Sequence, residues 1–372
     1  MVRPGPLRVL VVDDSAFNRR NIADILSGSD EIEVVGKAAD GEEALRLALS
    51  IKPDVITLDL EMPRMDGFTF LRILMVRQPT PVIVVSSYAH KENVFKALEL
   101  GAVDFVAKPS QKLAPDASLR REILQKVLLV RYLRPLAMAG ARPVLPNALS
   151  RPITTAAPIS TAAAVMPEPS ARSVAAIAAR FIVGIGSSTG GPTALLEILS
   201  RIPEKYPGAI LIAQHMPDKF TRTFAERLDR KSAIRVTEAQ DGDLVTARRA
   251  FICPGKMCME AVVTQGSGGV GWSEIRLRVG PPSQHDRYVP SADRLLRSIA
   301  PVGSRAYGII LTGMGDDGVA GARAIRAGGG TIVAESEETA VVYGMPRAAV
   351  RAGVVNESMG LPQVAEYVAG LT

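Results

Sequence analysis

The stretch LRVLVVDDS at residues 7–15 decides the fold of the first third of the chain. An apolar run leads directly into two aspartates, and SAFNRRNIADILSGS at 15–29 follows with helical spacing behind Ser15, a suitable N-cap. The same alternation of apolar run and amphipathic segment then repeats along the chain. Further strands are expected at 31–38, 54–59, 81–87 and 103–109, and helices at 41–53, 66–78, 91–101 and after residue 117. Five strands alternating with helices predict an α/β domain whose parallel sheet is covered on both faces.

A change of composition at Pro135 ends this pattern. Residues 135–179 hold 14 alanines and 7 prolines and no aromatic residue, so they bury too little apolar surface to offset their ordering entropy. We expect an interdomain linker there, between domains at 1–134 and 180–372. Strand and helix alternation resumes afterwards, with strands expected at 181–186, 209–214, 249–255, 307–315 and 330–335. The second domain is therefore predicted to be a doubly wound, mainly parallel α/β fold.

Composition and charge exclude several classes of protein. The net charge of +6 divides into +1, +2 and +3 over residues 1–134, 135–179 and 180–372, and aromatic residues make up only 5% of the chain. No basic stripe results, so a nucleic-acid partner is not expected. Two cysteines and three histidines exclude a disulfide framework or a multi-zinc protein. Since neither a signal peptide nor an apolar run long enough for a membrane span is evident, we expect a cytoplasmic protein that is not embedded in a membrane.

Polar residues follow four of the five strands expected in the first domain. They are Asp13 and Asp14, Asp59, Ser86 and Lys108. Each alone would pass for a solvated loop residue or a helix cap. Together they should meet at the carboxyl edge of the sheet, where ligands of such folds bind. Three carboxylates repel one another unless a cation joins them, and their oxygen atoms suit Mg²⁺, while the lysine and the serine would provide donors for an added anionic group.

These residues give the first domain a resemblance to the receiver domain of two-component response regulators. The matching motifs are VVDDS at 11–15, LDLEMPRMDG at 58–67, VSS at 85–87 and DFVAKP at 104–109. The resemblance implies a flavodoxin-like (βα)5 fold and a phosphoryl group accepted by Asp59 from a histidine kinase. It also implies that Asp14, assisted by Asp13, holds Mg²⁺ together with Asp59 and the carbonyl of Glu61.

The same resemblance gives roles to the last two strands. Ser86 and Lys108 would bind the phosphoryl oxygens, and Phe105 matches the aromatic switch position. The bond between Lys108 and Pro109 matches a peptide that is often cis in these domains, and X-Pro bonds are where cis peptides cost least. A phosphoryl group adds about −1.5 to −2 charges, so it would draw the two donors toward it and bias a two-state surface nearby.

FIVGIGSSTGGPTALLEILSRIP at 181–203 combines a strand, a glycine-rich turn and a helix, an arrangement that two chemistries use. Dinucleotide binding needs GxGxxG and an acid at the end of the next strand. Here Gly184 and Gly186 fit, but Thr189 occupies the third position and the next strand ends in Gln214 and His215. A nicotinamide-dependent enzyme is therefore disfavoured.

The second chemistry is that of a nucleophilic serine. Residues 186–190 fit the G-x-S-x-G pattern, which would expose Ser188 on a sharp turn beside a helix N-terminus. A serine needs a base, and His215 is the best candidate because adjacent strand ends of a parallel sheet approach closely. Either Asp316 or Asp317 could orient it, or simply cap the next helix. The order Ser, His, Asp differs from that of α/β-hydrolases, so another fold is expected.

The second domain resembles the catalytic domain of chemotaxis protein-glutamate methylesterases. The matching motifs are GSSTGG at 186–191, QHMP at 214–217, FAERL at 224–228, GPP at 280–282, PSAD at 290–293, LTGMGDDG at 311–318 and YGMPRAA at 343–349. The resemblance implies a triad of Ser188, His215 and Asp317 and an oxyanion donor in the backbone N–H of Met314.

The chain departs from that family at three positions. Ser187 stands where alanine is common, Asp316 where asparagine is common, and Val289 where a basic residue is common. The last change bears on how an acidic receptor would be recognised.

The combined resemblance implies an enzyme that hydrolyses glutamate γ-methyl esters, and deamidates specific glutamines, on methyl-accepting chemotaxis receptors. It implies that the unphosphorylated receiver covers the catalytic face, that a chemotaxis histidine kinase is the phosphodonor, and that only the receiver needs Mg²⁺, the esterase reaction requiring no cofactor. We expect a monomer. One alternative is a related output in a non-motility chemosensory pathway. A DNA-binding output would instead require a compact helix-turn-helix module, which the second domain does not resemble.

Overall fold

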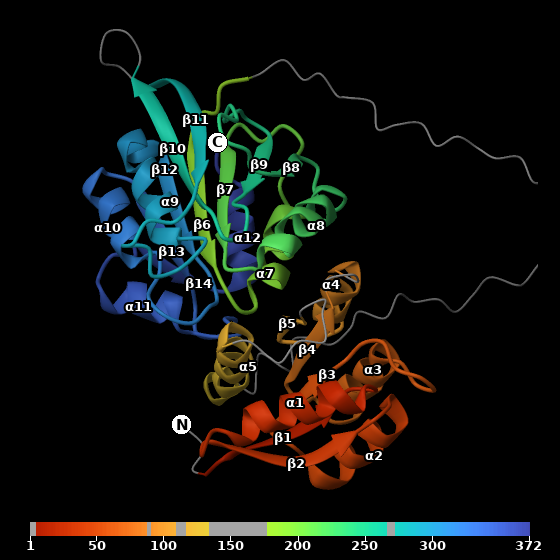
Figure 1. Cartoon of the computed structure of the whole chain (residues 1–372). Coiled ribbons are helices and arrows are strands. Elements are labelled where there is room, and N and C mark those ends of the chain that lie inside the picture. The colour runs from red at the N-terminus through yellow and green to blue at the C-terminus, as the bar shows by residue number, and fades with distance from the viewer. Residues whose placement is uncertain (1–4, 88–90, 109–116, 134–176, 266–271) are drawn as a thin grey trace, which may run out of the picture.

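The computed structural model describes residues 5–87, 91–108, 117–133, 177–265 and 272–372 (Figure 1). The predicted linker lies almost wholly outside these residues, as does Pro109, so the Lys108–Pro109 bond is not described. Within the described part, two α/β domains are present, which confirms the predicted fold class. Residues 178–179, assigned above to the linker, belong to the second domain, because Ala178 bridges to Thr246 and Ala179 is buried in its core.

The first domain is a five-stranded parallel sheet in the order β2-β1-β3-β4-β5. Its strands β1 to β5 are Leu7–Val12, Ile32–Ala38, Val55–Leu58, Val82–Ser87 and Asp104–Lys108. Its helices α1 to α5 are Ala16–Ser27, Gly41–Ile51, Gly67–Arg77, Lys91–Glu99 and Ala117–Leu129, followed by the 3-10 helix η2 at Val130–Tyr132. This strand order is that of flavodoxin-like folds, so the sequence-based prediction is confirmed.

Local sequence signals place three of these helices. Ser15 caps α1 by accepting from the Asn18 N–H, and Asp66 caps α3 by accepting from that of Thr69. Asp40 caps α2 by accepting from two backbone N–H groups at once. These caps fix where each helix starts, and therefore which loop residues stay at the carboxyl edge of the sheet.

The second domain is built on a seven-stranded parallel sheet in the order β14-β13-β12-β6-β7-β9-β8. Its strands β6 to β9 and β12 to β14 are Ile182–Ser187, Ala209–Gln214, Arg235–Glu238, Arg249–Ile252, Ala306–Ile310, Thr331–Glu335 and Glu357–Met359. Its helices α7 to α12 are Gly191–Leu199, Asp218–Asp229, Ala292–Ile299, Val319–Ala327, Met345–Arg351 and Leu361–Ala369, with the 3-10 helix η3 at Ala300–Arg305.

The five strands expected in the second domain are all present, and four more accompany them. The edge strands β8 and β14 have only four and three residues. The strands β10 (Cys258–Gln265) and β11 (Trp272–Gly280) pair antiparallel as a separate two-stranded sheet. The fold is therefore mainly parallel, as predicted, with one antiparallel ribbon that the sequence analysis missed.

The two domains pack through an aromatic cluster, the four rings of Phe95, Phe105, Phe220 and Phe224. Phe95 of α4 stacks on Phe224 of α8 with a centroid separation of 5.2 Å, and Phe105 of β5 lies 4.6 Å from Phe220. All four side chains are at most 2% exposed. Helices α4 and α5 lie between the two sheets in Figure 1. One hydrophobic core thus runs from the first domain into the second.

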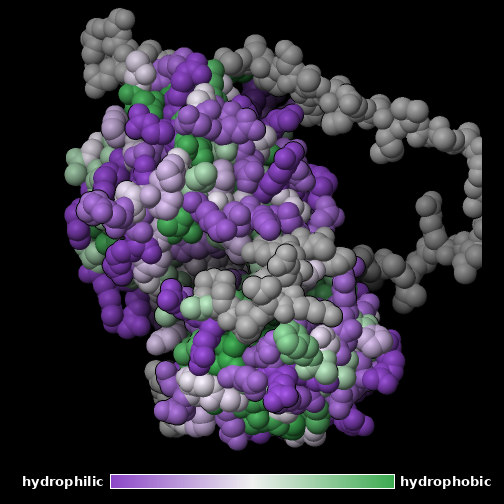
Figure 2. Space-filling view, in the orientation of Figure 1, coloured by the Kyte–Doolittle hydropathy of each residue, from purple (hydrophilic) through white to green (hydrophobic). Residues whose placement is uncertain are grey.

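The outer face of the molecule seen in Figure 2 is mainly hydrophilic, with hydrophobic residues scattered in small groups. In the described parts of the chain, no helix combines the length and the apolar character needed to cross a membrane.

Candidate active site and candidate phosphorylation site

The candidate nucleophile Ser188 sits in the turn between β6 and α7. Its backbone N–H donates to the Thr312 carbonyl over 3.0 Å, and its carbonyl accepts from the side-chain amide of Gln214 over 2.9 Å. The preceding Ser187 is fully buried and donates to the other end of that amide, whereas Ser188 is partly exposed. Gly190 adopts a φ of +81°, a backbone conformation that favours glycine. The turn is therefore fixed from both sides and presents only the second serine.

His215 and Asp317 meet beside this turn. Strands β12 and β7 flank β6, so the residues that follow them lie on either side of Ser188 at the same sheet edge. Nε2 of His215 lies 2.8 Å from Oδ2 of Asp317, which is 1% exposed. The carboxylate also accepts from the backbone N–H groups of Ala292 and Asp293, at the start of α9. Backbone donors at a helix N-terminus stabilise a buried negative charge.

The geometry distinguishes the two adjacent aspartates. Asp317 contacts His215, while Asp316 is exposed and accepts from Tyr288 and Arg287. Because Nε2 of His215 is occupied by Asp317, Nδ1 is the ring nitrogen left for the serine. Within the described chain, the Ser188 hydroxyl makes no hydrogen bond to that ring, and such bonds often tighten only when substrate binds.

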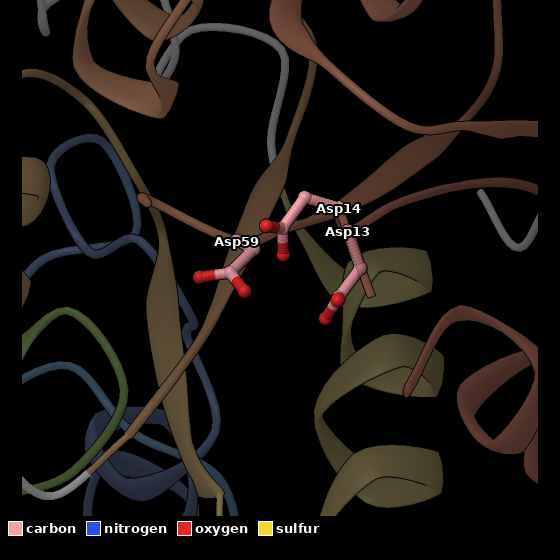
Figure 3. A group of neighbouring side chains, drawn as sticks. All are labelled: Asp13, Asp14 and Asp59. Atoms are coloured by element: carbon pink, nitrogen blue, oxygen red, sulfur yellow. The ribbon is translucent and has the colours of Figure 1, made fainter. Parts of the chain in front are cut away.

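The carboxyl edge of the first sheet carries the acidic residues expected there (Figure 3). Carboxylate oxygens of Asp13, Asp14 and Asp59 all lie within 4.8 Å of one another. Nζ of Lys108 lies 2.6 Å from Oδ2 of Asp13 and 2.5 Å from Oδ2 of Asp59. Burial raises the pKa of Asp13 even though the lysine opposes that shift. This set of hard oxygen donors fits Mg²⁺, which would relieve the repulsion among the three carboxylates.

The remaining candidate residues of the first domain lie at the same edge or beside it. Ser86 is 2% exposed near the end of β4, and Phe105 is 2% exposed in β5. The Glu61 N–H donates to Oδ1 of Asp59 over 3.4 Å, in the loop that leads into α3. The pKa of Lys108 is raised, since two carboxylates outweigh the burial that would lower it. The structure therefore gathers four of the five residues predicted to be polar at strand ends, Asp13, Asp14, Asp59 and Lys108, into one cluster, with Ser86 on the neighbouring strand.

Comparison with known proteins identifies both domains. Residues 9–116 match the response regulator receiver domain, and residues 183–368 match the CheB methylesterase. A protein-glutamate methylesterase/protein-glutamine glutaminase from Geobacter sulfurreducens is 46% identical over 97% of this chain and 96% of its own. The chain belongs to the CheB methylesterase family. It is therefore a methylesterase that carries a response regulator receiver domain, as the resemblance in its motifs indicated.

A second full-length relative and two solved single domains are also similar to this chain. A relative from Myxococcus xanthus, named protein-glutamate methylesterase/protein-glutamine glutaminase 1, is 44% identical over 100% of this chain and 99% of its own. The crystal structure of the Thermotoga maritima CheB methylesterase catalytic domain is 34% identical, with a TM-score of 0.48, and covers 52% of this chain and 98% of that one. The response regulator domain of Thermotoga maritima CheB is 41% identical, with a TM-score of 0.32, over 35% of this chain and 99% of that one.

Two residues beside the candidate active site were missed in the sequence analysis. Glu335, 1% exposed, accepts from the Thr312 N–H over 2.9 Å and from the Thr339 hydroxyl, and burial raises its pKa to about 7. It thus supports the residue whose carbonyl holds the Ser188 N–H. The sequence signal was the acid that ends the strand at 330–335. The second residue is Tyr288, whose ring stacks on that of His215. It lies in a loop without periodicity, so no pattern pointed to it.

The receiver domain touches the turn that carries Ser188 directly. The hydroxyl of Thr189, the residue after Ser188, donates to Oδ2 of Asp104 in β5. The other oxygen of Asp104 pairs with Lys126 of α5 over 3.0 Å. Asp104 and Thr189 are both buried. A carboxylate of the receiver is therefore bound to the catalytic domain one residue away from the candidate nucleophile.

Proposed function

We propose that this enzyme hydrolyses γ-methyl esters of glutamate, and deamidates specific glutamines, on methyl-accepting chemotaxis receptors. Ser188 is the nucleophile, His215 the base and Asp317 the group that orients the base. The observation that supports this most directly is the 2.8 Å bond between His215 and a buried Asp317, at the sheet edge where the Ser188 turn lies. Relatives 44–46% identical over nearly the whole chain bear names with the same two activities.

The reaction proceeds in two half-reactions. His215 takes the proton of the Ser188 hydroxyl as its oxygen attacks the ester carbonyl, and returns the proton to methanol as the C–O bond breaks. Water then attacks the acyl-enzyme in the same way and releases the glutamate. Asp317 fixes the tautomer of the imidazole and stabilises the imidazolium that forms. With a glutamine substrate, the same steps release ammonia instead of methanol.

The backbone N–H of Met314 supplies an oxyanion donor. Within the described chain this N–H has no hydrogen-bond partner, while its neighbour Gly313 donates to the Val342 carbonyl. The Met314 side chain is 39% exposed, so the loop opens to substrate. One such donor contributes about 2.7–4 kcal/mol to transition-state stabilisation in other hydrolases.

Methanol release from methylated receptor membranes tests the activity. We expect wild-type protein to release methanol and Ser188→Ala to release none above the uncatalysed rate. Ser187→Ala is the matched control, because its hydroxyl is buried against Gln214, and this variant should keep most of the activity. Retained methanol release in Ser188→Ala would contradict the assignment of the nucleophile.

We infer further that phosphorylation of Asp59 by a chemotaxis histidine kinase activates the enzyme. Asp13, Asp14, Asp59 and the Glu61 carbonyl would hold Mg²⁺, which neutralises negative charge during phosphoryl transfer. The donors of Ser86 and Lys108 would then bind the phosphoryl oxygens. Since Lys108 pairs with two carboxylates now, a new anion on one of them redistributes its hydrogen bonds within the same pocket.

The interface between the domains supports this regulation. Phe105, three residues before Lys108, packs on Phe220 of the catalytic domain. Near Phe95 and Phe224 of the same cluster, Arg227 pairs with Glu99 over 2.6 Å. Movement of Phe105 would therefore disturb the aromatic cluster and the nearby contact between Asp104 and Thr189. Release of that contact frees the turn that carries Ser188.

Acetyl phosphate with Mg²⁺ tests the regulation without the kinase. Methanol release by wild-type protein should rise, and release by Asp59→Asn should stay at its unstimulated level. If acetyl phosphate raised the activity of Asp59→Asn as much as that of the wild type, activation through this aspartate would be wrong.

A further inference from the structure

The ring of Tyr288 lies parallel to the imidazole of His215 in an offset stack. The two ring centroids are 5.3 Å apart and the planes differ by only 5°. Tyr288 precedes α9, whereas His215 follows β7, so the contact joins two distant parts of the catalytic domain. Stacked rings at this separation attract one another, and each restricts rotation of the other.

The hydroxyl of Tyr288 anchors this ring to the loop after β12. It donates to Oδ1 of Asp316 over 3.0 Å, and Arg287 holds the other oxygen of that carboxylate over 3.3 Å. Burial, together with the hydrogen bond to Asp316, raises the pKa of Tyr288, so the hydroxyl keeps its proton at neutral pH. The phenol therefore donates its hydrogen bond to Asp316 throughout the neutral pH range.

The loop after β12 is shaped to receive this hydroxyl. Gly315 has a φ of +95°, and a Cβ placed there would lie 2.3 Å from the Tyr288 oxygen. A pocket of about 380 Å³ lies on this side of the site, and its lining includes Tyr288, Asp316 and Asp317 but not His215. The tyrosine therefore lines that pocket and contacts the imidazole as well.

We propose that Tyr288, anchored through Asp316, is a positioning residue that holds the imidazole of His215 in the orientation needed for proton exchange with Ser188. The bond to Asp317 fixes one nitrogen but leaves the ring free to pivot about that contact. A stacked face removes this freedom, and the free Nδ1 then points in one direction. The groups facing the imidazole and its partner ring are Asp317, Tyr288, Asp316 and Arg287. This inference rests on the proposed function, because it assumes that His215 is the base.

A double-mutant cycle in the full-length protein, stimulated with acetyl phosphate, tests the proposal. Tyr288→Leu should lower kcat about tenfold and leave KM within about twofold, since the stack acts on proton transfer and not on substrate binding. Tyr288→Phe keeps the ring but loses the anchor, and Asp316→Ala loses the same anchor from the other side. Each should lower kcat about threefold, and the double variant should fall no further than either single variant. Asp316→Asn keeps an acceptor oxygen and should lose less than Asp316→Ala.

A second readout separates this proposal from the proposed function. A small phosphonofluoridate labels an activated serine without any receptor, and its rate reports how well the base activates Ser188. We expect the labelling rates to follow the same order as kcat. Gln284→Ala, an exposed change in the same loop, is the control and should label at the wild-type rate. Melting temperatures show whether any variant is unfolded. If Tyr288→Leu does not fold, Asp316→Ala, at an exposed residue, still tests the proposal.

Two results would overturn the positioning role. One is labelling of folded Tyr288→Leu at the wild-type rate. The other is a multiplicative loss in the double variant, which would show that the hydroxyl and Asp316 act independently. Failure of the proposed function has a different signature, since labelling would still require Ser188 and depend on Tyr288 while methylated receptors released no methanol.

Discussion

The two polar sites of this protein stand at the same place in their sheets but are neutralised in different ways. In the receiver, three carboxylates meet one ammonium, that of Lys108, at the carboxyl edge of a five-stranded sheet. In the catalytic domain, the single carboxylate of Asp317 is held by backbone N–H groups and by His215 at the edge of a seven-stranded sheet.

The two sites differ in how freely the partners of their carboxylates can rearrange. A lysine side chain can move to a new anion, and a cation can enter among carboxylates, so the receiver pocket can occupy more than one state. Backbone donors at the start of α9 are held in place by the helix, so the partners of Asp317 have less freedom to move than a lysine side chain has. On the proposed function, the regulatory site is the one whose charges are balanced by a side chain, and the catalytic site is the one whose carboxylate is balanced by the backbone.

Removing the charge of Asp317 in the catalytic domain should have the largest effect on activity. We expect Asp317→Asn to lower kcat for methanol release about 10³–10⁴-fold, because the amide leaves His215 without a partner for its charged form and favours the wrong tautomer. Asp316→Asn, the same change one residue earlier, is the matched control and should lose less than tenfold. Equal losses in the two variants would mean that the position of the carboxylate does not matter.

Removing the charge of Lys108 in the receiver pocket should lower the stability of that domain. Lys108→Met leaves Asp13, which is fully buried, and Asp59 without their cation, and we expect the free energy of unfolding of the receiver to fall by about 3–5 kcal/mol. Millimolar Mg²⁺ should restore part of the loss, since a cation that binds only the folded state stabilises it. Urea titrations with and without Mg²⁺ measure both effects. A stability unchanged by the substitution would show that the lysine does not balance the two carboxylates.

The sequence was sufficient for residues that follow a strand. Asp13, Asp59 and Lys108 each come directly after an apolar run, and His215 follows a strand that ends in Gln214; parallel pairing alone brings such positions to one edge. Choosing between Asp316 and Asp317 from the residues was not possible, because neighbouring side chains in a glycine-rich loop point in directions set by backbone angles such as the positive φ of Gly315 and Gly318. Only the resemblance to a family separated them.

Contacts made by loops and between domains could not be predicted from strand ends and periodicity. Tyr288 stacks on His215 from an irregular loop, and Asp104 reaches Thr189 across an interface that no periodicity describes. The ribbon β10–β11 was missed for another reason. Its strands carry charged residues on the face away from the core, such as Glu260 and Arg276, and they pair outside the main sheet, so their alternation was not recognised.

The buried Glu335 offers a third test, because it holds Thr312, whose carbonyl accepts from the Ser188 N–H. Its pKa of about 7 lies above the ordinary value near 4.5, so the folded state binds this proton more tightly than the unfolded state does. Stability should therefore be greatest below about pH 4.5 for this group and fall as the pH rises through 7, by on the order of 3 kcal/mol. Glu335→Gln resembles the protonated form and lacks this dependence. In denaturation at pH 5 and pH 8, the variant should gain stability relative to the wild type at the higher pH, and a constant difference would contradict the expectation.

The smallest effect on activity is expected from an ion pair at the interface between the two domains. Arg227 of the catalytic domain pairs with Glu99 of the receiver at a partly exposed edge of the aromatic cluster, so the pair contributes about 1 kcal/mol or less to the docking of the domains. Glu99→Arg should raise unstimulated methanol release less than about fivefold, because like charges now face each other across the interface. Adding Arg227→Glu restores an opposite pair and should return the activity toward the wild-type value. If the double variant were as active as Glu99→Arg alone, this ion pair would not hold the receiver in place, and the docking would rest on the aromatic rings and on the contact between Asp104 and Thr189.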